Sequence, residues 1–371
     1  MAIYYVTICL LAGLGYVLTE KKRDLPAASY YPAFVFAALL LVASFRYAIG
    51  FDYFSYQNFY EQMSVYTCSD ILRTYPYEPL FFLVCRCFCL LGCSYPIFLV
   101  FVNIFLLFTV LFFLRRFSKL FWVSVYLYIT LQFFAYHMNL LRQSIALSFF
   151  LLAYPYLKNK KILPFTALLL IGGLFHNSLW FLFPFYFLLP KKMSGTSIGL
   201  LLGAAITGYL FFDPLFQFFQ PLVPEKYRLY QISYFWNAST ADYVIPSAVY
   251  MALVFSLRRR VTDPVSRAIY LNSALYNFCI SLFLTKHFIL ERFAVYPFAF
   301  SLLAIPQLIV SDSGEHSPDS GKQQRVRKYL TLLFLLFGAF YFLFAVKKGF
   351  HNVYPYVSLF DKSLSVPAAQ P

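Results

Sequence analysis

The sequence predicts an all-α, polytopic transmembrane protein with about twelve membrane-spanning helices. Of its 371 residues, 61% are hydrophobic and only 12% are charged, whereas a typical soluble domain carries about 25% charged residues. The apolar residues come in blocks of about 15 to 20, the length an α-helix needs to cross a hydrocarbon layer about 30 Å thick. In that layer a helix satisfies its own backbone amides. We therefore expect lipid around most of the chain.

Short polar or basic breaks separate the apolar blocks, and we expect residues 1–371 to form a single transmembrane domain. The first block lacks a basic segment before it and a small-residue cleavage site after it, which indicates a retained helix rather than a signal peptide. The expected spans cover residues 3–19, 30–49, 96–114, 120–137, 140–157, 162–175, 177–189, 196–212, 244–257, 268–286, 293–310 and 329–346.

The basic residues give the orientation, because cytoplasmic loops of membrane proteins are enriched in Lys and Arg. The net charge of +15 is spread over short clusters between apolar blocks, which indicates topology rather than nucleic-acid binding. Twelve spans with both termini outside place every cluster on the inner side. These clusters are Lys21-Lys22-Arg23, Arg115-Arg116 with Lys119, Lys158 with Lys160-Lys161, Lys191-Lys192, Arg258-Arg259-Arg260 with Arg267, and Lys322 through Lys328.

This topology predicts three loops: an outer-face loop at 50–95, a second outer-face loop at 213–243 and a cytoplasmic loop at 311–328. The first contains the apolar segment 78–93, which is short and carries Arg86 in its middle. We expect this segment to be an interfacial or re-entrant helix. If it crossed the membrane, every later segment would change side. The loops are too short to be independent domains.

An ionisable residue close to lipid is costly and is therefore a functional candidate. The first such cluster ends the second span, where Arg46, Asp52, Tyr53 and Tyr56 surround Gly50. Gly50 permits a tight turn, and Asp52 and Tyr56 share a face if a helix follows. An aromatic belt at the membrane surface, with an Arg46–Asp52 ion pair, is the structural alternative.

Glu78 stands directly before Pro79 at the start of the short apolar segment. A glutamate there suits a helix N-terminus electrostatically, so a capping role is one interpretation. The other is a general base, because a partly desolvated carboxylate can have a raised pKa.

Two further candidates open or close later spans. Asn139, Arg142 and Gln143 begin the fifth span on what we expect to be one helix face, and Arg binds phosphate through a planar fork of donors. His176 and Ser178 lie between two short spans. Snorkelling of Arg142 to the interface, and a simple hairpin turn at His176, are the structural alternatives.

The predicted topology places these four clusters on the outer side, together with Arg292. Several arginines, carboxylates and tyrosines on one face suit a substrate that carries a diphosphate and sugars. The sequence has no phosphate-binding loop and no dinucleotide fingerprint, so an outer-face glycosyl reaction would use a lipid-linked donor. Cys85, Cys87, Cys89 and Cys93 lack the spacing of a zinc site, and we expect no metal ligand and no cofactor, although a divalent cation stays open.

Taken in order, these motifs resemble the EpsG-like branch of the Wzy-type bacterial polysaccharide polymerases. The resemblance covers most of the chain. Phe51 and Leu140 depart from the residues common in that family but leave the charged positions intact. The matching residues are Arg46, Gly50, Asp52, Tyr53, Tyr56, Glu78, Pro79, Leu80, Asn139, Arg142, Gln143, Ile145, Ala146, Phe175, His176, Ser178, Arg292, Tyr296, Pro355 and Tyr356.

The resemblance implies a GT-C-like fold and polymerisation of lipid-linked oligosaccharide repeat units on the outer face of the bacterial cytoplasmic (inner) membrane. The growing glycan would pass from polyprenyl diphosphate to the non-reducing end of an incoming repeat unit. Asp52 is the first candidate for the base and Glu78 the second. The substrate and its diphosphate would contact Arg46, Tyr53, Tyr56, Asn139, Arg142, Gln143, His176, Ser178 and Arg292.

Polyprenyl-diphosphate-linked oligosaccharides and membrane lipid are the expected partners, with chain-length regulators or flippases as protein partners and no nucleic acid. A flippase or transporter of the same lipid-linked glycans is the competing function. A transporter would carry polar residues through the whole bilayer depth, whereas the strongest candidates here collect on one side. A related GT-C-type ligase or glycosyltransferase would differ in its acceptor.

Overall fold

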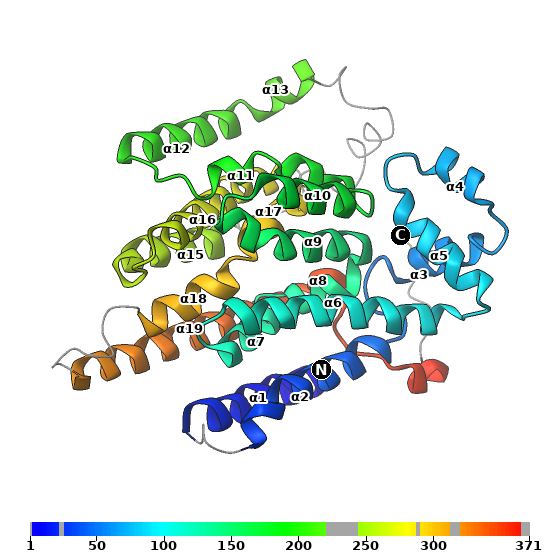
Figure 1. Cartoon of the computed structure of the whole chain (residues 1–371), viewed down its shortest axis with the longest axis horizontal. Coiled ribbons are helices and arrows are strands. Elements are labelled where there is room, and N and C mark those ends of the chain that lie inside the picture. Colours follow the sequence, from blue (N-terminus) through cyan, green and yellow to red (C-terminus); the bar gives the residue numbers. More distant parts are fainter. Residues whose placement is uncertain (1, 22–25, 220–243, 287–289, 312–319, 365–371) are drawn as a thin grey trace. The chain divides into compact units, whose positions relative to one another are not determined.

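The computed structural model describes residues 2–21, 26–219, 244–286, 290–311 and 320–364. Across these ranges the regular elements are helices (Figure 1), and the extended pairing is an isolated antiparallel bridge between Arg46 and Ser358. The prediction of an all-α fold is therefore confirmed.

Within the expected domain, contacts group the chain into two compact units, which we describe separately: Met1–Phe183 with Lys322–Pro371, and Pro184–Gly321. The first unit contains α1 Ala2–Tyr16, continued by a π-helical turn at Val17–Lys21, α2 Ala27–Ser44, α3 Tyr53–Gln62, α4 Cys68–Thr74, α5 Pro79–Leu90, α6 Tyr95–Phe117, α7 Phe121–Thr130, α8 Phe133–Asn139, α9 Leu141–Lys158, α10 Ile162–Gly173, the 3₁₀ helix η2 Asn177–Leu182, and nearly all of α19 Ser320–Lys348. After α19 come the short 3₁₀ turns Phe350–Asn352 and Leu359–Leu364.

The second unit contains α11 Phe185–Leu188, α12 Gly195–Leu210, α13 Phe212–Phe219, α15 Val244–Leu257, the 3₁₀ turn Arg258–Arg260, α16 Pro264–Leu284, α17 Glu291–Phe298 and α18 Ser301–Val310. Inside it, Asn272 of α16 donates to the carbonyls of Leu188, Leu189 and Lys191 at 2.7 to 3.0 Å. These bonds satisfy carbonyls at and beyond the end of α11, which the helix itself leaves unpaired.

Five helical segments of the described chain are long and apolar enough to cross a membrane: Ala2–Lys21, Ala27–Ser44, Tyr95–Phe117, Glu291–Val310 and Gly321–Lys348. A sixth is added if α12 and α13, which meet at an angle of 76°, count as one broken span. These helices identify a membrane-embedded protein. The total of twelve spans stays a prediction.

Several expected spans differ in detail from the helices. The second ends at Ser44 rather than at residue 49, and residues 120–137 form two helices that break at Gln132, whose φ is +71°. Gln132 lies in this turn because its side chain accepts a hydrogen bond from the Tyr354 hydroxyl at 2.8 Å. Residues 177–189 are a 3₁₀ helix and one short α-helix around Pro184. Part of the predicted loop 311–328 is helical, because α19 begins at Ser320.

The expected interfacial segment 78–93 contains helix α5. This helix has 12 residues, so its length is about 18 Å, less than the roughly 30 Å of a hydrocarbon core. Arg86, in its middle, donates to the carbonyls of Met63 and Ser64 at 2.9 and 2.7 Å. The charge therefore satisfies the carbonyl end of α3, and α5 by itself is too short to cross.

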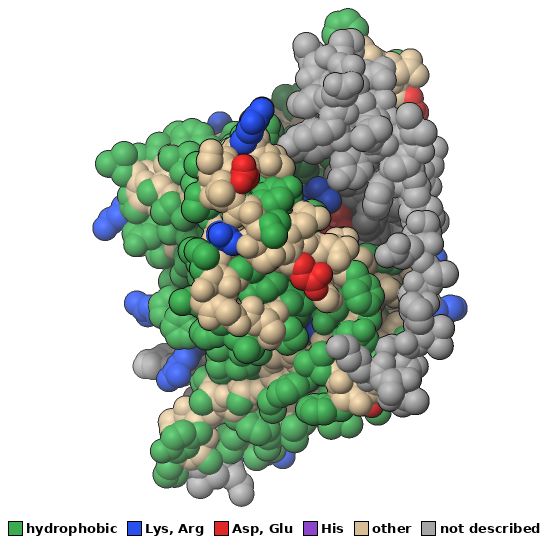
Figure 2. Space-filling view, turned by 90° about the vertical axis from the view of Figure 1, so that its right-hand side faces the viewer, with side chains coloured by type: hydrophobic (Ala, Val, Ile, Leu, Met, Phe, Trp, Pro, Cys, Tyr) green, Lys and Arg blue, Asp and Glu red, His purple; other side chains and the backbone are tan. Residues whose placement is uncertain are grey.

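Within the first unit, α3, α4 and α5 lie together beyond the start of α6 (Figure 1). The Tyr60 hydroxyl donates to the carbonyl of Cys93 at 2.6 Å, and the amide of Leu80 donates to the carbonyl of Leu174 at 3.2 Å. Figure 2 shows hydrophobic side chains interspersed with uncharged polar side chains and backbone, and a few charged side chains among them. Leu72 and Leu90 are among the exposed apolar residues of α4 and α5. Exposed apolar residues of this kind suit the predicted position of α5 at the membrane interface.

The helices of the first unit have two distinct ends. Where α1 finishes and α19 begins, Glu20 pairs with Arg327; we call this the basic end, because Lys21 and Lys322 through Lys328 lie there. Where α1 begins and α19 finishes, the Tyr4 hydroxyl donates to the carbonyl of Val353 at 2.9 Å. We call this the tail end.

Helix α6 runs from the tail end toward the basic end. At its start, the Tyr95 hydroxyl donates to the carbonyl of Tyr53, and at its finish stand Arg115 and Arg116. With 23 residues, α6 is about 34 Å long. The predicted separation of basic clusters from candidate site residues is thus present along the helices of this unit.

Candidate functional site

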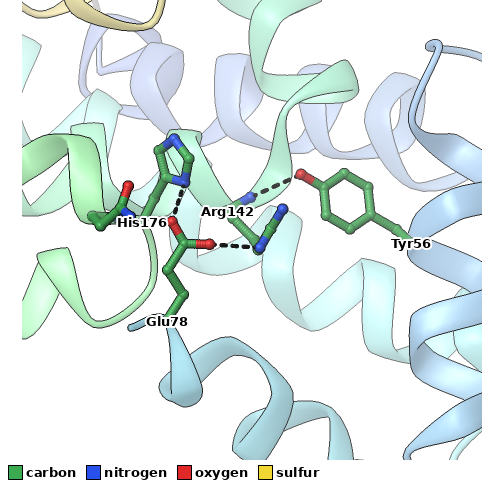
Figure 3. A network of polar contacts seen from close by, with 5 residues as sticks. Tyr56, Glu78, Arg142 and His176 are labelled. Atoms are coloured by element: carbon green, nitrogen blue, oxygen red, sulfur yellow. Dashed lines mark hydrogen bonds and ion pairs between the residues drawn. The ribbon is translucent and has the colours of Figure 1, made fainter. Parts of the chain in front are cut away.

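At the tail end of the first unit, Glu78 binds two other side chains that the sequence singled out (Figure 3). One carboxylate oxygen, Oε2, lies 2.6 Å from Nη1 of Arg142. The other, Oε1, lies 2.9 Å from Nδ1 of His176 and accepts a hydrogen bond from the amide of Asn177 at 3.0 Å. One carboxylate therefore links the starts of α5, α9 and η2.

Glu78 does not cap its own helix. It is the N-cap residue of α5, with φ −138° and ψ 48°, and its side chain makes no capping hydrogen bond. Because Pro79 follows, Glu78 is restricted to non-helical backbone conformations. The capping interpretation of Glu78 is therefore wrong, since its carboxylate points to α9 and η2 instead.

The expected rise in the pKa of Glu78 is also wrong. Burial raises this pKa, but the hydrogen bond from His176, the charges of Arg142 and His176 and the amide of Asn177 outweigh it, so that the pKa falls to about 2. Each of these partners stabilises the carboxylate form. Glu78 is thus a permanent negative charge at neutral pH.

Arg142 lies in the first turn of α9, next to an aromatic group. The centroids of the Phe59 and Phe82 rings lie 6.0 and 5.7 Å from its guanidinium carbon, a range in which a ring attracts a cation. Phe82 in turn stacks on Tyr75, with 3.5 Å between centroids. The arginine is therefore held by one carboxylate and two aromatic rings.

The guanidinium of Arg142 also has donor capacity left. Its Nε is buried and has no hydrogen-bond partner among the described residues. An arginine carries five N–H donors, and a diphosphate offers many acceptor oxygens. A quarter of the side chain is exposed, so an anion of that kind can reach the guanidinium, although not its buried Nε.

Gly50 brings Asp52 against Asn139. Its φ of +96° is open to glycine, and a Cβ at this position would lie 3.0 Å from Oδ1 and 3.1 Å from Cα of Asn139. This close approach lets Oδ1 of Asn139 accept a hydrogen bond from the amide of Asp52 at 3.1 Å. Asp52 then serves as the N-cap residue of α3.

Tyr56 connects Asp52 with Arg142. Its hydroxyl accepts a hydrogen bond from the amide of Arg142 at 3.4 Å. Burial raises the pKa of Tyr56, the charge of Arg142 lowers it and the charge of Asp52 raises it again. Asp52, Tyr56 and Arg142 therefore influence one another electrostatically within a single site.

The predicted common helix face of Asn139, Arg142 and Gln143 is wrong. Leu140 has φ −105° and ψ 70°, so the chain leaves helical geometry between Asn139, the last residue of α8, and α9. Asn139 and Arg142 still reach the same site from two helices. Gln143 is buried, with 2% of its surface exposed.

Arg46 lies behind the site rather than in it. It is 1% exposed, and its guanidinium donates to the carbonyls of Ala43 and, at 3.1 Å, Met138. It thereby joins the end of α2 to α8. Tyr53 is also buried, and its ring contacts Tyr47 and Tyr95 edge to face.

The two remaining candidates are Ser178 and Arg292. Ser178 lies in η2 two residues after His176 and is buried. Arg292 is a partly buried residue of α17 in the second unit. Within the described ranges, no group of three or more His, Cys, Asp or Glu side chains could hold a metal ion.

Sequence reasoning missed the contribution of the tail after α19. The amide of Gly50 donates to the carbonyl of Asn352 and that of Tyr47 to the carbonyl of Val357, both at 2.9 Å. Nδ1 of His351 lies 3.4 Å from Nδ2 of Asn139. Of this tail, the sequence had singled out only Pro355 and Tyr356, as residues that match the family, and not as a support for the site.

The comparisons with known proteins identify the family of the chain. A family model described as the EpsG family matches residues 29–358, which is nearly the whole chain. The chain belongs to the EpsG family. No curated protein and no solved structure matches it.

Membership of the EpsG family confirms the resemblance seen in the motifs. This family is a Wzy-type, polysaccharide-polymerase-like family. It indicates an exopolysaccharide-related, polymerase-like function and a glycosyltransferase-like enzyme in a membrane-embedded protein. The described site lies wholly inside the matched residues.

Proposed function

We propose that this EpsG family protein polymerises lipid-linked oligosaccharide repeat units. A hydroxyl oxygen at the non-reducing end of an incoming unit attacks the anomeric carbon of the growing glycan. The bond from that carbon to the diphosphate oxygen breaks, and polyprenyl diphosphate leaves with the electron pair. The observation that carries the proposal is the Glu78–Arg142 pair beside Asp52, a fixed cation next to a carboxylate at the tail end.

In this proposal Asp52 is the base that takes the proton of the acceptor hydroxyl. A carboxylate with a pKa near 2 is a weak base at neutral pH, which favours Asp52 over Glu78. Asp52 is partly exposed, and its backbone is fixed by Gly50 and Asn139. Fixed geometry of this kind lowers the barrier by keeping the reacting groups in position.

Arg142 then stabilises the charge that develops on the departing diphosphate. Such preorganised charge is among the largest contributions to enzymatic rates. Glu78 holds Arg142 and His176 in place, and His176, Asn139 and Gln143 orient the substrate with Tyr53, Tyr56 and Ser178 around it. Arg46, which is buried behind the site, supports α8 and is not a substrate contact in this proposal. Arg292 lies in the second unit and has no role in the proposal. No nucleotide or cofactor enters the reaction, and a divalent cation is not required by it.

The proposal places the site at the outer face of the bacterial cytoplasmic (inner) membrane, in a fold related to the GT-C glycosyltransferases. The separation between the tail end and the basic end of the first unit supports this orientation, because basic residues favour the cytoplasmic side. Polyprenyl-diphosphate-linked oligosaccharides are the substrates, in a membrane shared with chain-length regulators or flippases.

The competing functions are a flippase for the same glycans and a ligase that uses another acceptor. A flippase would use alternating access around a site at the bilayer midplane. The concentration of Asp52, Glu78, Arg142 and His176 at one end of the helices supports an enzyme instead. A ligase would differ from a polymerase only in the acceptor molecule to which the glycan is transferred.

The test is made in the producing organism, with the gene deleted and replaced by variants. We expect Arg142→Ala and Asp52→Asn to leave single repeat units on gels of surface polysaccharide where the wild-type gene gives long chains. Arg73→Ala and Glu61→Gln are matched controls, because both side chains are exposed on α4 and α3 outside the site. Both should give normal chains.

The outcomes separate the candidate functions. Long chains from normally expressed Arg142→Ala would contradict the role of Arg142, and long chains from Asp52→Asn would exclude Asp52 as the base. A deletion that removes all surface glycan, rather than leaving single units, would support flipping or earlier assembly.

A further inference from the structure

The amide group of Asn139 has a defined orientation in the site. Its Oδ1 accepts a hydrogen bond from the backbone amide of Asp52 at 3.1 Å. An N–H group can only donate, so the oxygen must face Asp52. The Nδ2 group therefore faces the other way, toward the ring of His351, where Nδ1 lies 3.4 Å from it.

This orientation determines the protonation of His351. Because Nδ2 of an asparagine is always a donor, Nδ1 of His351 must be the acceptor and must carry no proton. The ring is then neutral, with its proton on Nε2. Burial lowers the pKa of His351 to about 4, in agreement with a neutral ring at neutral pH.

The tail holds His351 in an unusual backbone conformation. His351 has φ +59° and Asn352 has φ +51°, values that L-residues other than Asn and Asp rarely adopt. The carbonyl of Asn352 accepts the amide of Gly50 at 2.9 Å, and the ring of His351 meets that of Tyr136 edge to face at 5.4 Å. The tail therefore contacts two residues that position Asp52. One is Gly50, in the turn before Asp52, and the other is Asn139, which accepts a hydrogen bond from the amide of Asp52.

We propose that His351 is a positioning residue for Asp52: as a hydrogen-bond acceptor it fixes the amide of Asn139, which in turn fixes the backbone of Asp52. This inference rests on the proposed role of Asp52 as the base. Without the acceptor, the Asn139 amide is free to turn, and its Nδ2 then faces the amide of Asp52. Two donors would face each other, and Asp52 would lose its fixed position.

A purely structural role for His351 makes a different prediction. If the ring only fills space against Tyr136, any replacement that removes the ring should have the same effect, whether or not it accepts a hydrogen bond. If the acceptor matters, an asparagine should restore function, because its Oδ1 takes a place similar to that of Nδ1. Asparagine also tolerates positive φ, and glycine does so without an acceptor.

The experiment compares His351→Asn with His351→Gly in the complemented deletion strain. We expect His351→Gly to lower the yield of long chains by about 10- to 100-fold, the effect of a misplaced reacting group, and His351→Asn to stay within about 3-fold of wild type on the same scale. Tyr354→Phe is the matched control, because it removes another hydrogen bond of the tail, to Gln132, without touching Asn139. Protein level and thermal unfolding in detergent are measured for each variant.

Two results would overturn the inference. One is wild-type chain length from normally expressed His351→Gly, and the other is an equal loss in His351→Asn and His351→Gly. If Asp52→Asn stops polymerisation while His351→Gly does not, the proposed function stands and only the role of His351 fails. If Asp52→Asn keeps full polymerisation, the base assignment fails, and the inference about His351 fails with it.

Discussion

Glu78 and Arg142 are 64 residues apart in the chain, yet their side chains meet at 2.6 Å and bring the starts of α5 and α9 together. Both are partly shielded, with 15% and 25% of their side chains exposed. The second oxygen of Glu78 contacts His176 and Asn177. Removing either charge therefore leaves the other residue without its main partner.

We predict that Glu78→Gln lowers the free energy of unfolding by about 1.5 to 3 kcal/mol, the usual range for a hydrogen bond to a charged group. The double variant Glu78→Gln with Arg142→Gln should lose clearly less than the sum of the two single variants, because each single change already breaks the pair. Denaturant unfolding in detergent measures this. Strictly additive losses would show that the pair contributes nothing of its own.

The sequence predicted the helices well where apolar blocks were long, because a lipid-facing helix needs little more than length and hydrophobicity. Breaks inside such blocks were not predicted. The break at Gln132 occurs without any proline or glycine, because Gln132 is held by Tyr354. The break at Leu140 falls at the predicted boundary between the spans 120–137 and 140–157, but its effect, which is to bring Asn139 and Arg142 to one site from two helices, was not predicted. These are tertiary effects that a local pattern does not contain.

In the candidate site, too, the sequence indicated individual residues but not the contacts between them. Asp52, Glu78, Arg142 and His176 stood out because charged and polar residues are costly near lipid. Their partners did not, because the bonds that position them join distant segments. The contacts of Glu78 with Arg142 and of Asn139 with His351 span 64 and 212 residues, and a single sequence gives no sign of either.

We predict that Gly50→Ala stops polymerisation, whereas Gly92→Ala does not. Both glycines have positive φ, +96° and +70°, so each substitution carries a backbone cost of about 1 to 2 kcal/mol. At Gly92 a Cβ would meet nothing within 4 Å, but at Gly50 it would press on Asn139. Chain length on gels, with protein level as the reference, makes the comparison. Equal effects of the two substitutions would mean that only backbone strain matters at Gly50.

If α5 lies at the outer interface, as we predict, a defined pattern of cysteine labelling follows. In a background free of the seven native cysteines, we restore Cys68, or introduce Leu91→Cys or Lys119→Cys, since all three positions are exposed. A membrane-impermeant maleimide applied to spheroplasts should label positions 68 and 91, which flank α5. Position 119, beyond the far end of α6, should react only after permeabilisation. Labelling of 68 and 91 from opposite sides would show that α5 crosses, and the outer-face assignment would fail.

The pKa values of Glu78 and His351 predict two pH windows, which overlap only near pH 4, in which stability depends on pH. Glu78 has a pKa of about 2 in the folded protein and an ordinary value of 4.5, so the unfolded chain binds a proton first and stability falls as the pH drops from 4.5 toward 2. His351 has a pKa of about 4 against an ordinary 6.5. The unfolded chain again binds the proton first, and this contribution is lost as the pH drops from 6.5 toward 4.

The two variants should therefore flatten different parts of the stability profile. His351→Asn should reduce the slope between about pH 6.5 and pH 4, because no group at that position then takes up a proton on unfolding. Glu78→Gln should reduce the slope below about pH 4.5. Unfolding midpoints of the purified protein, measured in detergent from pH 3 to pH 8, give both profiles. If His351→Asn retained the wild-type slope above pH 4.5, His351 would not be held neutral by the fold, and the hydrogen bond from Asn139 to its Nδ1 would lose its basis.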